Sequence, residues 1–405
     1  MDSSFQFKLL KKDSTTKARV GEIHTPHGVI QTPAFVAVGT RATVRSLTPE
    51  DLKDTGVQLL FGNTYHLHLR PGEDLVQDFG GLGKFMRWDG PTITDSGGFQ
   101  VFSFGQKKVV DFDPSNHARN LPDQEEDDAL LVKINEDGVE FRSHIDGSKH
   151  FFSPEESIGI QKKLGADIIL CFDECAPYPS DHAYTQKAME RTHNWAQRSL
   201  AEFKVQNEKF KVNPHQALYG IVQGGVYKDL REESAKFISS LDFDGIAVGG
   251  VSVGESKDEM RKALQWVHPF LPEQKPRHLL GIGEIDDIFA GVEYGMDTFD
   301  CVIPTRFGRY GIVFVRPEES DGKPYRVDLM RTIYAEDKRP ISKYCTCYVC
   351  KKYTRAYLHH LFRVKELLAY RLASYHNMYF INHLVENIRQ SILNGKFEDL
   401  KKQWL

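Results

Sequence analysis

The chain has 405 residues, of which 40% are hydrophobic and 27% charged, so it can bury one large core or two smaller ones. Its formal net charge of -4 and isoelectric point near 6.5 exclude a protein that attracts nucleic acid through its overall charge. The N-terminal segment lacks the apolar core of a signal peptide and no apolar run reaches membrane-spanning length, so we expect a cytoplasmic protein.

Short apolar runs rich in strand-forming residues alternate with amphipathic stretches along most of the chain. This alternation predicts a parallel α/β fold, and eight such units favour a (β/α)8 barrel, or TIM barrel, over an open doubly wound sheet. The eight runs begin at Pro33, Gln58, Thr92, Asp167, Leu218, Gly245, Arg277 and Thr298.

Two segments carry the signals of helix starts. Thr48-Pro49-Glu50 and Ser153-Pro154-Glu155-Glu156 each offer a capping hydroxyl, a proline at the first helical position and acidic residues in the first turn. Between them, residues 115–128 are polar and strongly acidic, which is typical of a solvated loop. We assign no chemistry to that stretch.

Polar residues and glycines follow six of the predicted strands. They are Asp95-Ser96-Gly97-Gly98, Asp173-Glu174, Gln223-Gly224-Gly225, Gly249-Gly250, Gly281-Ile282-Gly283 and Asp300. Each alone could be a cap or a turn, but the carboxyl ends of barrel strands share one mouth, so we expect these groups to meet there.

Several carboxylates, an amide and glycines around one mouth suit a flat ligand rich in hydrogen-bonding groups, such as a purine. Two separated carboxylates also match the nucleophile and acid/base pair that break a glycosidic bond with retention. Because successive strand side chains point to opposite faces, Asp173 and Glu174 cannot both face the ligand.

The chain changes character after the eighth strand. From Lys323 to Arg371 there are twelve Lys and Arg residues against four Asp and Glu, and Leu367, Leu368 and Leu372 follow with helical spacing. We predict a barrel domain over residues 1–310, with an N-terminal extension and the acidic loop, and a zinc-binding subdomain over 311–405 whose helices pack on the barrel. A run of positive charge is usually a solvated face, and here it could equally form a basic surface that neutralises phosphates.

Three of the six cysteines, Cys345, Cys347 and Cys350, lie within six residues of one another. This spacing is typical of metal ligands rather than of disulfides and favours a reducing compartment. Tetrahedral zinc needs a fourth ligand, for which spacing alone nominates His359, His360, His376 or His383. With four protein ligands the Zn2+ would be structural.

Several segments, in order along nearly the whole chain, resemble those of tRNA-guanine transglycosylases. The segments are TDSGGFQVFS from Thr94, FDECAPYP from Phe172, YGIVQGG from Tyr219, AVGGVSVGE from Ala247, LLGIGE from Leu279, FDCVIPTR from Phe299, CTCYVC from Cys345 and YHN from Tyr375. The resemblance implies a pentosyltransferase that exchanges guanine at the wobble position (34) of tRNAs with GUN anticodons (Asp, Asn, His and Tyr), a step of queuosine biosynthesis.

The resemblance also implies a role for each matching residue. Asp300 would be the nucleophile that forms a covalent ribosyl-aspartate intermediate, and Asp95 the acid/base. Substrate contacts would come from Asp95, Ser96, Gly97, Gly98, Phe99, Asp173, Gln223 and Gly250, with Phe99 able to stack on a base. The family pattern selects His376 as the fourth metal ligand.

Contacts to the tRNA anticodon stem-loop are implied for two further segments. The residues are Gly281, Ile282, Gly283, Glu284, Ile285, Asp286 and Asp287, followed by Thr305, Arg306, Phe307, Gly308 and Arg309. Members of the family commonly act as homodimers, so a homodimer is implied too.

The resemblance implies that Cys175 and Val253 occupy the positions that discriminate between incoming bases in this family. Bacterial members insert preQ1, and eukaryotic members, which tend to have valine and glycine there, insert the bulkier queuine. Valine at 253 favours preQ1, with queuine as the alternative. Two departures from the family pattern are the long acidic stretch and Ser252, a residue seen in eukaryotic-type sequences.

Three other functions compete with this interpretation. A sugar-phosphate or aldolase-type barrel would have no use for the cysteine cluster. A catalytically silent partner subunit would have lost a catalytic carboxylate, yet Asp95 and Asp300 are both present. An archaeal-type enzyme would normally carry extra C-terminal RNA-binding domains.

Overall fold

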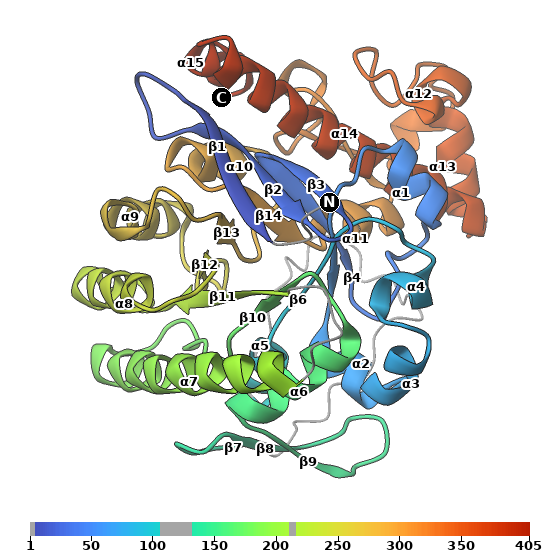
Figure 1. Cartoon of the computed structure of the whole chain (residues 1–405). Coiled ribbons are helices and arrows are strands. Elements are labelled where there is room, and N and C mark those ends of the chain that lie inside the picture. Colours follow the sequence, from blue (N-terminus) through green and yellow to red (C-terminus); the bar gives the residue numbers. More distant parts are fainter. Residues whose placement is uncertain (1–4, 106–131, 210–215) are drawn as a thin grey trace.

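The computed structural model describes residues 5–105, 132–209 and 216–405. Eight parallel strands close into a barrel in the order β10-β11-β12-β13-β14-β4-β5-β6 (Figure 1). They are β4 (Ala34–Gly39), β5 (Leu60–Gly62), β6 (Thr92–Thr94), β10 (Ile168–Leu170), β11 (Ala217–Val222), β12 (Gly245–Val248), β13 (Arg277–Leu279) and β14 (Thr298–Cys301). Each overlaps one of the eight predicted runs, so the predicted (β/α)8 barrel is confirmed.

Helices follow the strands and cover the outside of the barrel, with α7, α8 and α9 side by side along one flank (Figure 1). The helices up to the last barrel strand are α1 (Pro49–Asp54), α2 (Thr64–Leu69), α3 (Glu73–Asp78), α4 (Leu82–Met86), α5 (Gly98–Gly105), α6 (Pro154–Leu164), α7 (His182–Lys209), α8 (Lys228–Ser240), α9 (Lys257–Val267) and α10 (Ile285–Glu293), and α11 (Ile303–Arg309) comes after it. No helix in the described ranges is long and apolar enough to span a membrane.

Both predicted helix starts are present. The Thr48 side chain accepts a hydrogen bond from the backbone N–H of Asp51, whose carboxylate accepts one from the Thr48 backbone N–H, so α1 begins with a capping box. At α6, Ser153 Oγ accepts a hydrogen bond from the Glu156 backbone N–H.

Three antiparallel sheets were not predicted from the sequence. The first contains β1 (Gln6–Lys12), β2 (Arg19–Thr25) and β3 (Gly28–Thr32), and the second contains β7 (Lys133–Ile134), β8 (Val139–Arg142) and β9 (Lys149–Phe152). The third is the pair β15 (Ile312–Phe314) and β16 (Arg326–Asp328). Strand β1 has no fully buried residue and carries several lysines, so its apolar signal is weak. The acidic stretch 115–128 lies outside the described residues.

The C-terminal region packs on the barrel through α14, which contacts α11 and β4 (Figure 1). Its elements are β15 (Ile312–Phe314), β16 (Arg326–Asp328), α12 (Tyr348–Lys352), α13 (Arg355–Arg363), α14 (Leu367–Leu393) and α15 (Phe397–Trp404), and the short 3-10 helices of the chain are His268–Phe270, Pro317–Glu319 and Thr332–Tyr334. Of the leucines that predicted the long helix, Leu372 is fully buried, whereas Leu367 is exposed at the helix start.

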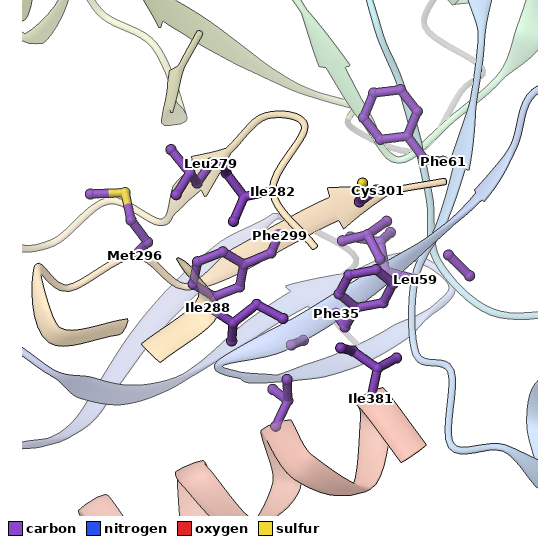
Figure 2. Packing of buried hydrophobic residues seen from close by; sticks show 14 of the residues in the cluster. Phe35, Leu59, Phe61, Leu279, Ile282, Ile288, Met296, Phe299, Cys301 and Ile381 are labelled. Carbon is purple, nitrogen blue, oxygen red and sulfur yellow. The ribbon is translucent and has the colours of Figure 1, made fainter. Parts of the chain in front are cut away.

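Side chains of α14 join the core that surrounds the barrel. Figure 2 shows Ile381 of α14 beside Phe35 of β4, and Ile288 of α10 beside Phe299 of β14. Because side chains alternate along a strand, burying Phe299 on this outer face turns Asp300 to the opposite face.

Candidate active site

Asp300 is a nearly buried carboxylate near the end of β14. Its Oδ1 accepts a hydrogen bond from the backbone N–H of Gly281 at 3.1 Å and lies 3.2 Å from Nε2 of His278. Both partners belong to β13 or the loop after it, which neighbours β14 in the barrel. Among the described residues, no group donates to Oδ2, so this oxygen is left for a ligand.

Asp95 directly follows β6 and is fixed by the residues that begin α2. Its Oδ1 accepts the backbone N–H of Thr64 at 2.8 Å, and its Oδ2 accepts the side-chain amide of Asn63 at 2.5 Å. The pKa of Asp95 is raised to about 7, chiefly by burial and also by the negative charges of Asp300 and Asp173, against the lowering effect of the Thr64 hydrogen bond. A carboxyl group with this pKa can both donate and accept a proton near neutrality.

Asp173 is held at the end of β10 by two side chains from neighbouring strands. Ser96 Oγ donates to its Oδ1 at 3.1 Å, and Gln223 Nε2 donates to its Oδ2 at 2.8 Å. Burial raises the pKa of Asp173 to about 6, against the lowering effect of these two hydrogen bonds. The structure therefore brings Asp173, Ser96 and Gln223 into one cluster, as expected from the shared mouth.

Glu174 points away from this cluster, as strand alternation predicts. Its carboxylate forms an ion pair with Arg191 and accepts a hydrogen bond from the Tyr184 hydroxyl at 2.9 Å. It is fully enclosed and paired, so its role is structural.

Gly250 lies against Gln223 after β12. Its φ is +61°, and a Cβ added there would lie 2.3 Å from Gln223 Oε1, so only glycine fits. The fully buried guanidinium of Arg231 donates to the carbonyls of Gly249 and Gly250, each at 2.7 Å. Arg231 thus fixes the backbone that lies beside Gln223.

The other members of the predicted pocket lie at the start of α5. Gly97 and Gly98 are buried, and Gly98 donates its backbone N–H to Ser96 Oγ at 3.2 Å. Phe99 is 47% exposed, so its ring is accessible for stacking.

Cys175 and Val253 both lie near Gly250. Cys175 is buried, and burial raises the pKa of its thiol to about 12. Val253 is half-buried and, together with Gly250 and Tyr178, lines a narrow cleft. Its backbone N–H donates to Glu255 at 2.9 Å.

The acidic residues of the first predicted RNA-contact segment form an ion-pair network. Lys257 Nζ lies 3.0 Å from Glu284, 2.6 Å from Asp286 and 2.9 Å from Asp287. Burial works against the charged form, yet hydrogen bonds to the two aspartates raise the pKa of Lys257. Ile282, Gly283 and Ile285 are buried, so the half-buried Gly281, Glu284 and Asp286 are the members of this segment that face solvent.

The second predicted RNA-contact segment lies in α11. Arg306 is exposed, Phe307 and Arg309 are half-buried, and Thr305 and Gly308 are buried. A Cβ on Gly308 would lie 2.6 Å from the backbone N of Ser374 in α14, so this glycine permits the close approach of the two helices.

Cys345, Cys347, Cys350 and His376 converge into a group that can bind a metal ion. His376 Nδ1 lies 3.7, 3.5 and 3.4 Å from the three sulfur atoms, respectively. Tetrahedral zinc with ordinary bond lengths would separate the nitrogen from each sulfur by about 3.6 Å, so the spacing fits. The other ring nitrogen of His376 donates to the Phe314 carbonyl at 2.8 Å, which fixes the ring.

The other histidines that spacing nominated lie elsewhere. His359 Nδ1 forms a hydrogen bond with the Leu329 carbonyl at 2.7 Å, and His360 and His383 are exposed. The neighbours of His376 in the YHN segment brace α14. Tyr375 donates to Asp54 in α1, and the Asn377 side-chain amide donates to the Pro304 carbonyl at 2.9 Å.

The sequence did not predict that three further residues belong to this site: Asn63, Arg231 and His278. Asn63 and His278 fall inside or beside predicted strands, where the residue type alone suggests no partner. Arg231 lies in a helix, where a solvated arginine is the usual expectation. Their partners become identifiable only once the order of the strands in the barrel is known. Asn63 then pairs with Asp95, Arg231 with Gly250 and His278 with Asp300.

Comparison with known proteins gives consistent matches. A family model described as "Queuine tRNA-ribosyltransferase" matches residues 13–405. A protein of that name from Caldanaerobacter subterraneus subsp. tengcongensis is 49% identical over 403 residues, covering 100% of this chain and 97% of that protein. Proteins of the same name from Roseiflexus sp. and Enterococcus faecalis are each 46% identical, covering 98% and 99% of this chain and 98% and 95% of their own lengths.

Proposed function

The chain belongs to the queuine tRNA-ribosyltransferase family, and from this premise we propose that it replaces guanine at the wobble position of GUN-anticodon tRNAs with preQ1. Family membership makes it a pentosyltransferase that acts on tRNA in queuosine biosynthesis. The choice of preQ1, the covalent intermediate and the set of tRNAs are the proposed parts.

In the proposed reaction, an ionised Asp300 oxygen attacks C1' of the wobble ribose. A bond forms between that oxygen and C1', the glycosidic bond breaks, and its electron pair leaves with guanine. Asp95 supplies the proton that guanine takes up. The incoming base then loses a proton to Asp95 and displaces Asp300 from C1', which restores both carboxyl groups.

The observation that carries this proposal is the unequal environment of two carboxylates at one barrel mouth. Asp300 keeps one oxygen free of hydrogen-bond donors from the described residues, as a nucleophile requires. Asp95 is largely enclosed by protein and has a pKa of about 7, as a proton carrier requires.

The purine would bind between these two groups. Asp173 and Gln223 are proposed to read its hydrogen-bonding edge, with backbone contact from Gly250 and stacking by Phe99. The hydrogen bond from Gln223 Nε2 to Asp173 Oδ2, at 2.8 Å, supports this assignment because it fixes the positions of both side chains before the purine binds.

Base choice is proposed to rest on the volume at Val253. Replacing Val253 with glycine should widen the cleft and permit queuine exchange, with a gain of about 10- to 200-fold in kcat/KM for queuine. The measurement is the exchange of labelled tRNA guanine with each base. Absence of any gain would contradict the steric explanation for preQ1 preference.

We also propose that the metal is Zn2+ in a structural role. Four protein ligands leave no position for substrate, and the spacing of the thiols and His376 supports tetrahedral coordination. The anticodon stem-loop would contact the mouth and the basic C-terminal region. A homodimer is proposed too, because members of the family commonly act as homodimers.

Exchange of radiolabelled guanine into a GUN-anticodon tRNA tests the function directly. The wild type should incorporate label, whereas Asp300→Ala should reduce incorporation to background. A tRNA with a different wobble base serves as the substrate control. Retained incorporation by Asp300→Ala would remove Asp300 from the nucleophile role.

A further inference from the structure

His278 is a fully buried histidine that bridges two residues of the neighbouring strand β14. Its Nε2 lies 3.2 Å from Asp300 Oδ1, and its Nδ1 lies 2.8 Å from Thr298 Oγ1. Thr298 and Asp300 lie two residues apart, so they share one face of β14. Both ring nitrogens are thereby engaged with the strand that carries Asp300.

The partners of the two nitrogens determine the hydrogen positions. An ionised carboxylate can only accept hydrogen bonds, so Nε2 must carry the hydrogen that points to Asp300. In the neutral ring Nδ1 is then an acceptor, and the Thr298 hydroxyl donates to it. We assign this tautomer because it satisfies every polar atom of the bridge.

The ring has little freedom to turn away from this position. It stacks on Phe61 of β5, with ring centroids 6.1 Å apart and an angle of 23° between the planes. Since His278 is fully buried as well, a rotation would break both hydrogen bonds without replacing them by water.

The two oxygens of Asp300 are therefore unequal. Oδ1 receives the hydrogens of His278 Nε2 and of the Gly281 backbone N–H, which approach at 3.2 and 3.1 Å. Oδ2 has no donor among the described residues. Two donors on one oxygen fix the rotation of the carboxylate and reduce the nucleophilicity of that oxygen, leaving the other for attack.

We infer that His278 is a positioning residue that holds Asp300 with Oδ2 directed at the ribose C1'. The inference rests on the proposed function, because it takes Asp300 as the nucleophile. During attack the Oδ2–C1' bond forms and the glycosidic electron pair leaves with guanine. His278 keeps its hydrogen throughout, because bond formation turns Asp300 into an ester whose remaining oxygen is a weaker base than the carboxylate.

Three substitutions separate hydrogen bonding from packing. In His278→Gln, the amide nitrogen is separated from Cβ by the same number of bonds as Nε2, so it can donate to Asp300. In His278→Asn the amide is one bond shorter and cannot reach Asp300, while His278→Leu removes the donor altogether. His268→Leu is the matched control, because this partly buried histidine has no contact with Asp300 among the described residues. Its Nδ1 lies 3.0 Å from the Tyr294 carbonyl and 3.5 Å from Arg277 Nη1.

The measurement is the single-turnover rate of covalent tRNA–protein adduct formation with a GUN-anticodon transcript, together with kcat and KM for guanine exchange. We expect His278→Leu and His278→Asn to lower the adduct rate by about 10- to 100-fold with KM for tRNA and guanine within about twofold of wild type. His278→Gln should recover most of the rate, and His268→Leu should match wild type.

Two results would overturn the inference: wild-type adduct rates in folded His278→Asn, or equal losses in His278→Gln and His278→Asn. If His278→Leu does not fold, the Gln and Asn pair decides, because both are polar and differ only in reach. Asp300→Ala is measured in parallel. Adduct formation by that variant would contradict the proposed function itself, whereas its absence together with a fully active His278→Asn would contradict the positioning role alone.

Discussion

Asp95 and Asp300 lie at the same barrel mouth, but their surroundings prepare them for different chemistry. Asp95 receives hydrogen bonds on both oxygens and has its pKa raised by burial to about 7. Asp300 receives both of its hydrogen bonds on one oxygen. The pattern of donors, rather than residue type, distinguishes the proposed proton carrier from the proposed nucleophile.

The pKa of Asp95 predicts a pH dependence for guanine departure. Because burial raises the pKa from 3.8 to about 7, Asp95 is mainly protonated below that pH and loses its proton above it. The single-turnover rate of guanine release should therefore fall by about tenfold per pH unit above pH 7.

Asp95→Asn provides the control for this pH profile. It should give a slow rate with no such decline, since the titrating group is gone. A wild-type rate that keeps rising between about pH 7 and pH 8.5 would contradict the role of Asp95 as the acid.

At the scale of single elements, helix α14 connects the metal-binding region to the barrel. It contributes His376 to the cluster and places Ser374 directly against Gly308 of α11. Arg371 of α14 also binds Asp51 of α1 through two hydrogen bonds of 2.9 and 2.8 Å. Contacts with two barrel helices fix where the metal-binding region lies relative to the mouth.

A pair of glycine substitutions tests the packing of α14. Gly308→Ala should lower the free energy of unfolding by about 1–3 kcal/mol, because its Cβ would meet the Ser374 backbone N at 2.6 Å. Gly159→Ala in α6 should raise it by about 0.5–1 kcal/mol, because its Cβ would meet only Gln206 Nε2, at 3.7 Å. Chemical denaturation measures both, and equal stability of Gly308→Ala and wild type would show that the helices can separate there.

The barrel strands could be predicted from the sequence because each is a short apolar run with turn residues after it. Strand β1 could not, since its lysines face solvent and hide the alternation. Asp95, Asp173 and Asp300 were predictable as strand-end carboxylates, and the cysteine spacing predicted a metal site. The contacts of Asn63, Arg231 and His278 could not be predicted from local pattern, because each depends on which strands are neighbours in the barrel.

At the scale of the whole molecule, charge is unevenly distributed along the chain. The net charge is -4, yet residues 323–371 carry twelve Lys and Arg against four Asp and Glu. Lys351 and Lys352 at the end of α12 are both exposed beside the cysteine cluster. A local basic surface can hold tRNA phosphates although the protein as a whole is acidic.

Removing these two lysines should weaken tRNA binding in a salt-dependent way. For Lys351→Gln with Lys352→Gln, the slope of log Kd against log salt concentration should decrease by about 0.9 for each phosphate that the variant no longer neutralises. The KM for guanine should stay unchanged. Lys187→Gln, at an exposed position on α7, is the control and should bind as wild type. An unaltered salt slope in the double variant would place the RNA elsewhere.

The central claim is that guanine exchange proceeds through a ribosyl bond to Asp300. The most direct measurement starts from the folded enzyme incubated with a GUN-anticodon tRNA. The adduct is isolated under denaturing conditions, and peptide mapping then identifies the residue that carries the tRNA. We predict an adduct in wild type that maps to Asp300, disappears on addition of guanine and does not form in Asp300→Asn. An adduct that persists in Asp300→Asn, or that maps to another residue, would contradict the claim.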